Sequence, residues 1–133
     1  MKLDRAALVA GILVALVIAV PAALIGQAID DESTRDNPSA AVLVFVALVL
    51  IGLAAGAAVA ARRQNVDAPL AHGIVTAVVT FLIVQGVGII RHVITNEDVL
   101  WSQVLSSALL SMVAGTIGGI IGGRLRHQAE HTG

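Results

Sequence analysis

Residues 40–61 read AAVLVFVALVLIGLAAGAAVAA, an unbroken apolar run without a charged side chain. Built as an α-helix, this run is about 33 Å long, which matches the hydrocarbon core of a bilayer at roughly 30 Å. Three more runs of similar length surround it, at residues 6–29, 70–94 and 99–123. The sequence therefore predicts an all-α integral membrane protein whose single transmembrane domain fills residues 1–133.

The composition agrees with a membrane protein and excludes several kinds of chemistry. The chain is 57% hydrophobic and 13% charged, whereas roughly 25% of the residues of an ordinary soluble domain are charged. It contains no cysteine, so disulfides, thiolate metal sites and thiol catalysis are absent. The segments between the runs are too short to hold a soluble domain, and we expect no nucleic-acid partner.

Short loops predict how the helices follow one another. The segments 30–38, 62–69 and 95–98 leave room only for tight connections, so consecutive helices should be antiparallel neighbours in an up-down-up-down four-helix bundle. Asp67 should cap the third helix just ahead of Pro69, and Pro21 should kink the first helix.

The distribution of charge predicts the orientation of this bundle. Six of the eight basic residues lie at the N-terminus, in the second loop or in the C-terminal tail: Lys2, Arg5, Arg62, Arg63, Arg124 and Arg126. The first and third loops are acidic, so the positive-inside rule places both termini in the cytoplasm. The alternative is that the first run is a secretory signal, cut near Gly26, which would leave three spans.

A weak internal repeat relates the two halves of the chain. An offset of 62 residues aligns residues 10–15 with residues 72–77 and Gly26 with Gly88. Two hairpins of the same orientation would be related by an axis along the membrane normal. Chance matches between Ala, Val, Gly and Ile explain the alignment equally well.

Small residues form stripes on three of the four helices. The fourth span carries a glycine-zipper pattern at four-residue spacing, formed by Ser107, Ser111, Gly115, Gly119 and Gly123. Shorter stripes include Gly11 in the first span and Gly52 and Gly56 in the second. Lipid does not drive helix association, so small faces that allow close backbone approach are packing surfaces. They pack either the bundle of one chain or the seam of a homo-oligomer.

Polar residues inside the spans are the default functional candidates of a membrane protein. Gln85 lies near the middle of the third span, with Thr76 and Thr80 before it, and Gln103 lies on the fourth span. At the depth of Gln85, Ser107 or Ser111 of the fourth span could form a Gln–Ser hydrogen bond that holds the two helices together. The alternative is a polar cleft for water or a substrate.

Other signals for chemistry are weak. His127, Glu130 and His131 match the spacing of one class of zinc peptidase, but they sit in a histidine-bearing solvated tail without a third rigid ligand. His72 and His92 lie at opposite ends of one span, which does not suit haem ligation. We therefore expect no catalytic residue, no metal and no cofactor. The first span also lacks the glutamate on which small multidrug exporters depend.

The glycine-rich end of the last span, AGTIGGIIGGR at residues 114–124, together with the four spans, resembles small uncharacterised membrane proteins of Gram-positive, high-GC bacteria. The resemblance implies a location in the bacterial plasma membrane and no particular activity. We expect a non-enzymatic scaffold or accessory subunit that acts through its small-residue faces, with the bilayer and either a second copy or another membrane protein as partners. The alternative is an oligomeric pore or small-solute transporter that uses a polar cleft between the third and fourth spans.

Overall fold

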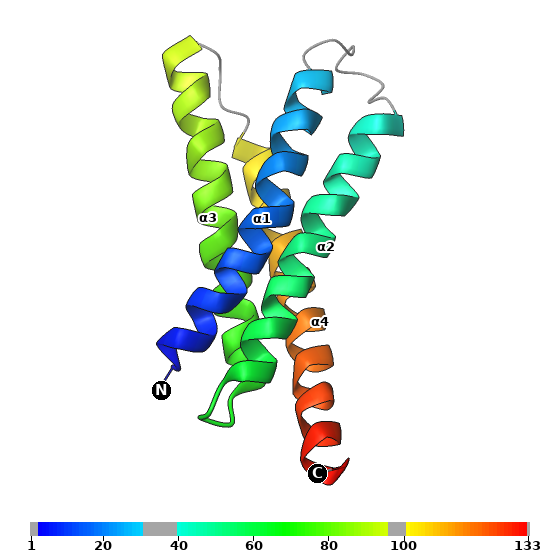
Figure 1. Ribbon diagram of the computed structural model, residues 1–133. Helices are drawn as coiled ribbons and strands as arrows, with labels where there is room; N and C mark the ends of the chain where they lie inside the picture. The colour runs from blue at the N-terminus through cyan, green and yellow to red at the C-terminus, as the bar shows by residue number, and fades with distance from the viewer. Residues whose placement is uncertain (1–2, 31–39, 96–100, 133) are drawn as a thin grey trace.

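The computed structural model describes residues 3–30, 40–95 and 101–132, and these form four long helices (Figure 1). In chain order they are α1 (Arg5–Asp30), α2 (Ala40–Arg63), α3 (Pro69–Thr95) and α4 (Trp101–Thr132). The predicted all-α, four-helix fold is confirmed, and α1 continues through Pro21.

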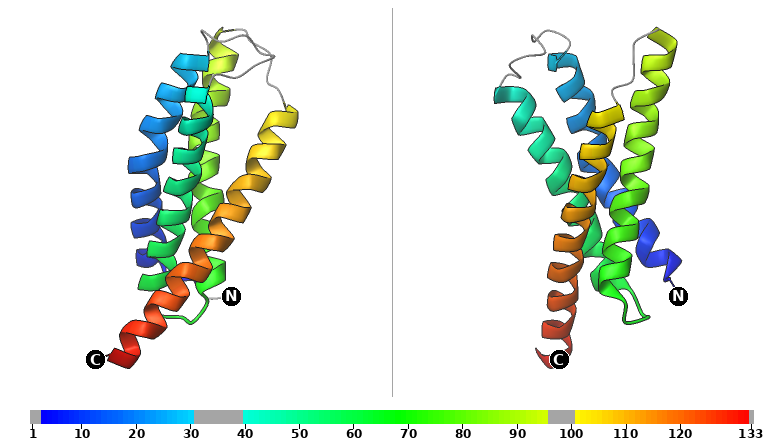
Figure 2. Two further views of the ribbon diagram at one scale, coloured as in Figure 1. Left: turned by 90° about the vertical axis from the view of Figure 1, so that its right-hand side faces the viewer. Right: turned by 180° about the vertical axis from the view of Figure 1, so that it is seen from behind.

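The four helices run alternately up and down, so both ends of the chain lie at one end of the bundle (Figures 1 and 2). We call this the closed end; it also holds the turn between α2 and α3. The opposite end is the open end. Helices α2 and α3 contact each other and both remaining helices, whereas α1 and α4 lie on opposite sides and do not touch within the described ranges.

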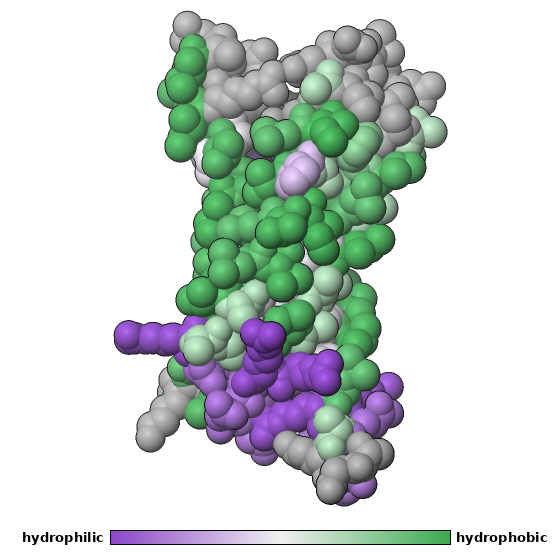
Figure 3. Space-filling model, in the orientation of Figure 1, coloured by the Kyte–Doolittle hydropathy of each residue, from purple (hydrophilic) through white to green (hydrophobic). Residues whose placement is uncertain are grey.

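Hydropathy is distributed inside out compared with a water-soluble protein. Large apolar side chains such as Val17 and Trp101 point outward, and hydrophilic residues gather at the closed end of the face that Figure 3 shows. All four helices are long and apolar enough to cross a membrane. These features indicate a multi-pass membrane protein.

Glycine decides how closely the helices approach at the closed end. A Cβ added at Gly11 would lie 2.5 Å from the carbonyl oxygen of Gly56 on α2, and one at Gly73 would lie 2.6 Å from that of Gly115 on α4. Only glycine permits such close backbone contact. Gly11 and Gly73 are also the residues that the 62-residue offset aligns, although the offset does not align their partners, Gly56 and Gly115.

Helix α4 meets both of its neighbours through glycine. Gly115 and Gly119 face α3, and Gly118 and Gly122 face the α2 backbone at Ala54 and Ala58. Only the first of these faces was predicted as a four-residue stripe.

At the helix ends, the structure adds one feature to the predictions and shows that another prediction was wrong. The histidine-bearing tail is helical, because α4 continues to Thr132; Leu125, Arg126 and Gln128 are good helix formers and extend the helix beyond the apolar run. Asp67 does not cap α3. It adopts a left-handed φ of 53°, and the side-chain oxygen of Gln64 accepts the Ala68 N–H at 2.8 Å instead.

Candidate functional site

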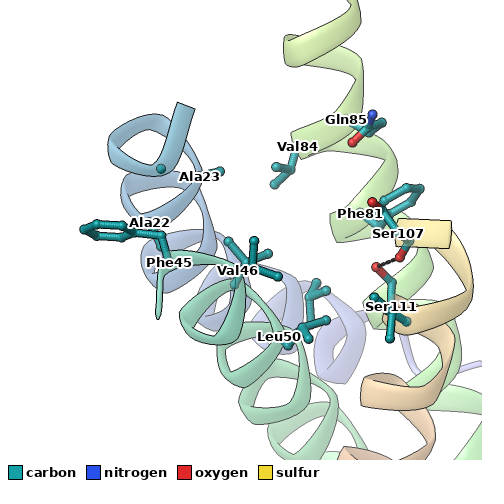
Figure 4. A pocket seen from close by; sticks show the side chains of 14 residues that line it. Ala22, Ala23, Phe45, Val46, Leu50, Phe81, Val84, Gln85, Ser107 and Ser111 are labelled. Atoms are coloured by element: carbon teal, nitrogen blue, oxygen red, sulfur yellow. Dashed lines mark hydrogen bonds between the residues drawn. The ribbon is translucent and has the colours of Figure 1, made fainter. Parts of the chain in front are cut away.

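A cleft of about 220 Å³ lies between all four helices, in the half of the bundle toward the open end (Figure 4). The helices diverge in this half (Figure 2). Its walls come from every helix: Ala22, Ala23 and Gly26 of α1; Phe45, Val46, Val49, Leu50 and Leu53 of α2; Phe81, Val84 and Gln85 of α3; Ser107, Leu110 and Ser111 of α4. None of these residues is charged.

One wall of the cleft is polar. Gln85 stands on α3 and the two serines stand on α4 (Figure 4). The Ser111 hydroxyl donates to the Ser107 carbonyl oxygen on its own helix at 2.8 Å. Within the described part of the chain, Gln85 bonds neither serine, so the predicted Gln–Ser bridge is not formed. The depths agree, but α3 and α4 diverge toward this end (Figure 2).

The remaining walls are apolar. Val46 and Leu50 project from α2 and Val84 projects from α3 into the same space (Figure 4), and the fully buried Leu53 lies deepest on α2. The volume is below the 300–1,000 Å³ that is usual for drug-sized ligands. Size and lining therefore suit a small neutral molecule with one hydrogen-bonding group.

Two buried threonines lie on α3 between the cleft and the closed end. Thr80 and Thr76 are fully buried on α3, four residues apart and hence on one face of the helix. Neither Oγ1 has a hydrogen-bond partner among the described residues, although a buried hydroxyl without a partner costs about 1–3 kcal/mol. The fourth polar candidate, Gln103, has a side chain outside the described residues.

The predicted packing residues divide between two environments. The six glycines contact neighbouring helices of the same chain: Gly11, Gly52, Gly56, Gly115, Gly119 and Gly123. Ser107 and Ser111 instead line the cleft. The glycine faces are thus turned into the bundle of one molecule.

At the closed end, His72 ties the N-terminus to α3. Its Nε2 accepts the Asp4 backbone N–H at 2.8 Å, and its Nδ1 lies 2.8 Å from the Ala68 carbonyl oxygen. An N–H can only donate and a carbonyl oxygen can only accept, so these partners require a neutral ring with the proton on Nδ1. The ring is fully buried. His72, Thr76 and Thr80 follow one another at four-residue spacing and so lie on one face of α3.

Asp4 is the second anchor of the N-terminus. Its Oδ1 caps α1 by accepting the N–H groups of Ala6 at 3.0 Å and Ala7 at 3.2 Å, and its Oδ2 accepts from the backbone and side chain of Asn65, both at 3.3 Å. These hydrogen bonds, first that from Ala7, hold the pKa of Asp4 below its ordinary value. Hydrogen bonds to the charged form lower the pKa of a carboxyl group.

Arg126 joins the long α4 to the same turn. It donates to the Gln64 carbonyl oxygen at 3.1 Å and lies 4.0 Å from the Asp67 carboxylate. This network was not predicted from the sequence. The polar Asp4 directly before an apolar run is a cap signal that could have been recognised; the meeting of residues 4, 65 and 72 has no sequence signal.

Metal ligands do not cluster in the described residues, where no three His, Cys, Asp or Glu side chains come together. His131 lies exposed near the end of α4. The side chains of His92 and Glu130 are outside the described residues.

Comparison with known proteins gives one match. A family model described as "Protein of unknown function (DUF3792)" matches residues 5–122, which include α1, α2, α3 and most of α4. The chain therefore belongs to the DUF3792 family. No curated protein and no solved structure matches it.

Proposed function

We propose that this DUF3792 protein is a non-enzymatic membrane protein that binds a small neutral solute in the cleft between its four helices. The observation that carries the proposal is the half-buried amide of Gln85, which lines the cleft and bonds no described residue. An amide can donate two hydrogen bonds and accept two. In an apolar cavity this capacity, which the described residues leave unused, is a means of recognising a ligand.

The absence of charge along the cleft wall limits the class of solute. An ion would have to leave its hydration shell without a counter-charge, which costs far more than the transfer of a neutral polar group. The solute is therefore a neutral molecule of a few heavy atoms with a donor or acceptor for Gln85. No described residue of the cleft offers a nucleophile next to a base, which agrees with binding rather than catalysis.

Binding, rather than free passage, is the function that we propose, because the closed end is tightly packed. Gly11 against Gly56 and Gly73 against Gly115 bring the backbones together, and His72 ties down the N-terminus. A solute in the cleft would cross only after these contacts open.

For the cellular setting, we propose a bacterial plasma membrane, in a Gram-positive, high-GC species, with both termini in the cytoplasm. The excess of basic residues at the closed end supports this orientation. The cleft then lies in the outer half of the membrane.

Because the chain has no cysteine, single cysteines can test the cleft directly. We would place Ser107→Cys in the cleft and Leu109→Cys on the lipid-facing side of α4, where Leu109 is 59% exposed. A small, neutral, water-soluble thiol reagent should label the first several-fold faster in liposomes, because a thiol ionises to the reactive thiolate only where water reaches it. Excess acetamide, a small neutral amide, should slow labelling of Ser107→Cys, and Gln85→Leu should abolish this protection.

Equal, slow labelling of both cysteines would mean that the cleft is dry and would contradict the proposal. The scaffold or accessory subunit would then be the better function. One observation favours that second candidate: the closed end is tightly packed and large apolar side chains face outward all around the bundle. In that case a homo-oligomer or a complex would form through outward side chains such as Val17, because Gly119 is already in contact with α3. Light scattering in mild detergent would measure the assembly.

A further inference from the structure

A second hollow lies far from the cleft, in the groove between α1 and α2 near the closed end. Its volume is about 260 Å³, and it is lined by Ala10 and Val14 of α1 and by Val59, Arg62 and Arg63 of α2. The groove is apolar along its length and carries two guanidinium groups where α2 ends. The function proposed above does not use it.

The two arginines lack a counter-charge from the described protein. Neither forms an ion pair or a hydrogen bond with a described residue. The described acidic side chains at this end are already engaged: Asp4 caps α1 and holds Asn65, and Asp67 pairs with Arg126. Arg62 and Arg63 are both exposed, so an anion from outside this part of the chain can reach them.

The position of the pair decides what kind of anion can reach it. The apolar stretch of α2 extends over Leu43–Arg63, so both guanidinium groups lie where the hydrocarbon core gives way to the headgroup layer. Val14 and Val59 follow the same groove into the apolar region. An anion at this depth that also fills an apolar groove has a polar head and a hydrocarbon chain.

We propose that this groove is a binding site for one anionic phospholipid. The phosphate of the headgroup accepts hydrogen bonds from Arg62 and Arg63, since guanidinium groups match phosphate oxygens in a two-pronged geometry. One acyl chain lies against Ala10, Val14 and Val59. Basic pockets between transmembrane helices are known to bind such headgroups, and here the charge and the apolar groove are joined in one site.

The test counts lipids bound to the full-length protein by native mass spectrometry. The protein in mild detergent is titrated with dioleoyl phosphatidylglycerol and, separately, with dioleoyl phosphatidylcholine. We expect one phosphatidylglycerol to bind about tenfold to thirtyfold more tightly than phosphatidylcholine, the preference that two basic groups at a membrane surface supply.

Two kinds of variant separate the site from the general charge of the closed end. Arg62→Gln with Arg63→Gln should reduce the preference to about onefold. The matched control, Arg5→Gln with Arg124→Gln, removes the same charge from exposed positions outside the groove and should keep it. Val14→Trp fills the groove without changing a charge and should also weaken retention of phosphatidylglycerol.

Several outcomes would overturn the proposal. A preference that survives the Arg62 and Arg63 changes, or one that falls equally in the control, would mean that there is no site in the groove. If sn-glycerol 1-phosphate, which has no acyl chain, displaced phosphatidylglycerol at similar concentrations, the groove would be a phosphate site and not a lipid site. Unchanged melting temperatures of the variants would show that lost binding is not lost folding.

Discussion

The two halves of the bundle are built from the same four helices but pack in opposite ways. Toward the closed end, glycine and alanine such as Gly56 and Ala60 let backbones touch. Toward the open end, Phe45, Phe81 and Leu110 stand at the corresponding surfaces and leave a cleft. Apolar composition alone therefore does not determine packing in this protein. Small residues on facing helices close one end of the bundle, and bulky residues of α2 and α3 line the open end, where α1 and α4 also present small residues.

We expect the largest loss of stability when one methyl group is added at the closed end. The new Cβ of Gly118→Ala would press against the Ala54 carbonyl and lie 2.7 Å from Ala57 Cβ, so the variant should lose about 1–3 kcal/mol of stability. Gly86→Ala is the matched control, because its Cβ meets nothing within 4 Å. We expect the control to be neutral or up to about 1 kcal/mol more stable, since alanine favours helix. Reversible unfolding in detergent measures both, and equal losses would refute the contrast.

A second test removes the side chain of His72, which holds the N-terminus against α3. In His72→Leu the Asp4 N–H loses its acceptor, and a partly buried donor left without a partner costs about 1–3 kcal/mol. Much of this cost can be relieved by fraying of the first turn of α1. Hydrogen exchange should therefore speed up at Asp4 and its neighbours while α4 remains protected. His131→Leu, at an exposed position, should change neither region.

A third experiment determines where, along α3, the open half of the bundle ends. Thr80→Val replaces a buried hydroxyl that has no described partner by a methyl group of similar size, so stability should rise by about 1 kcal/mol. Thr116→Val removes a hydroxyl that donates to the Met112 carbonyl oxygen at 2.8 Å and should not stabilise. Loss of stability in Thr80→Val would mean that water or a solute reaches this depth, and the open half would then extend further down α3.

The smallest expected effect is the pH dependence of the first turn. The pKa of Asp4 is lowered, chiefly by the Ala7 N–H, so the folded state favours the charged carboxylate. Its stabilising effect is complete above the ordinary aspartate value of about 3.9 and is lost as the pH falls through the lower value of the folded protein. Amide signals of Ala6 and Ala7 should report this loss in a pH titration. In Asp4→Asn they should not titrate over that range.

The sequence predicted the architecture because hydropathy and loop length act locally. Residues 40–61 are long enough to span a bilayer, and short loops force neighbouring helices to be antiparallel. The end of α4 was missed because hydropathy reports where a span leaves the membrane and not where a helix stops; Thr132 lies well beyond the apolar run.

The candidate site was only partly predictable from sequence. Gln85, Ser107 and Ser111 were identified from their depth, and they do line one cleft. Their hydrogen bonding was not predictable, because depth in the membrane does not fix the lateral distance between two helices, and α3 and α4 diverge toward the open end (Figure 2). The contact between Asp4 and His72 joins residues 68 positions apart and requires the folded bundle.

The two glycine faces of α4 bear on the order in which the chain assembles. Gly115 and Gly118 fit against backbones of two different helices, α3 and α2. The surface against which α4 packs therefore forms only after those two helices have come together. Helix α1 makes no contact with α4 in the described ranges and can join the others without it. During synthesis α4 is the last of the four to emerge, and we expect it also to be the last to dock, so the order of translation and the order of assembly coincide.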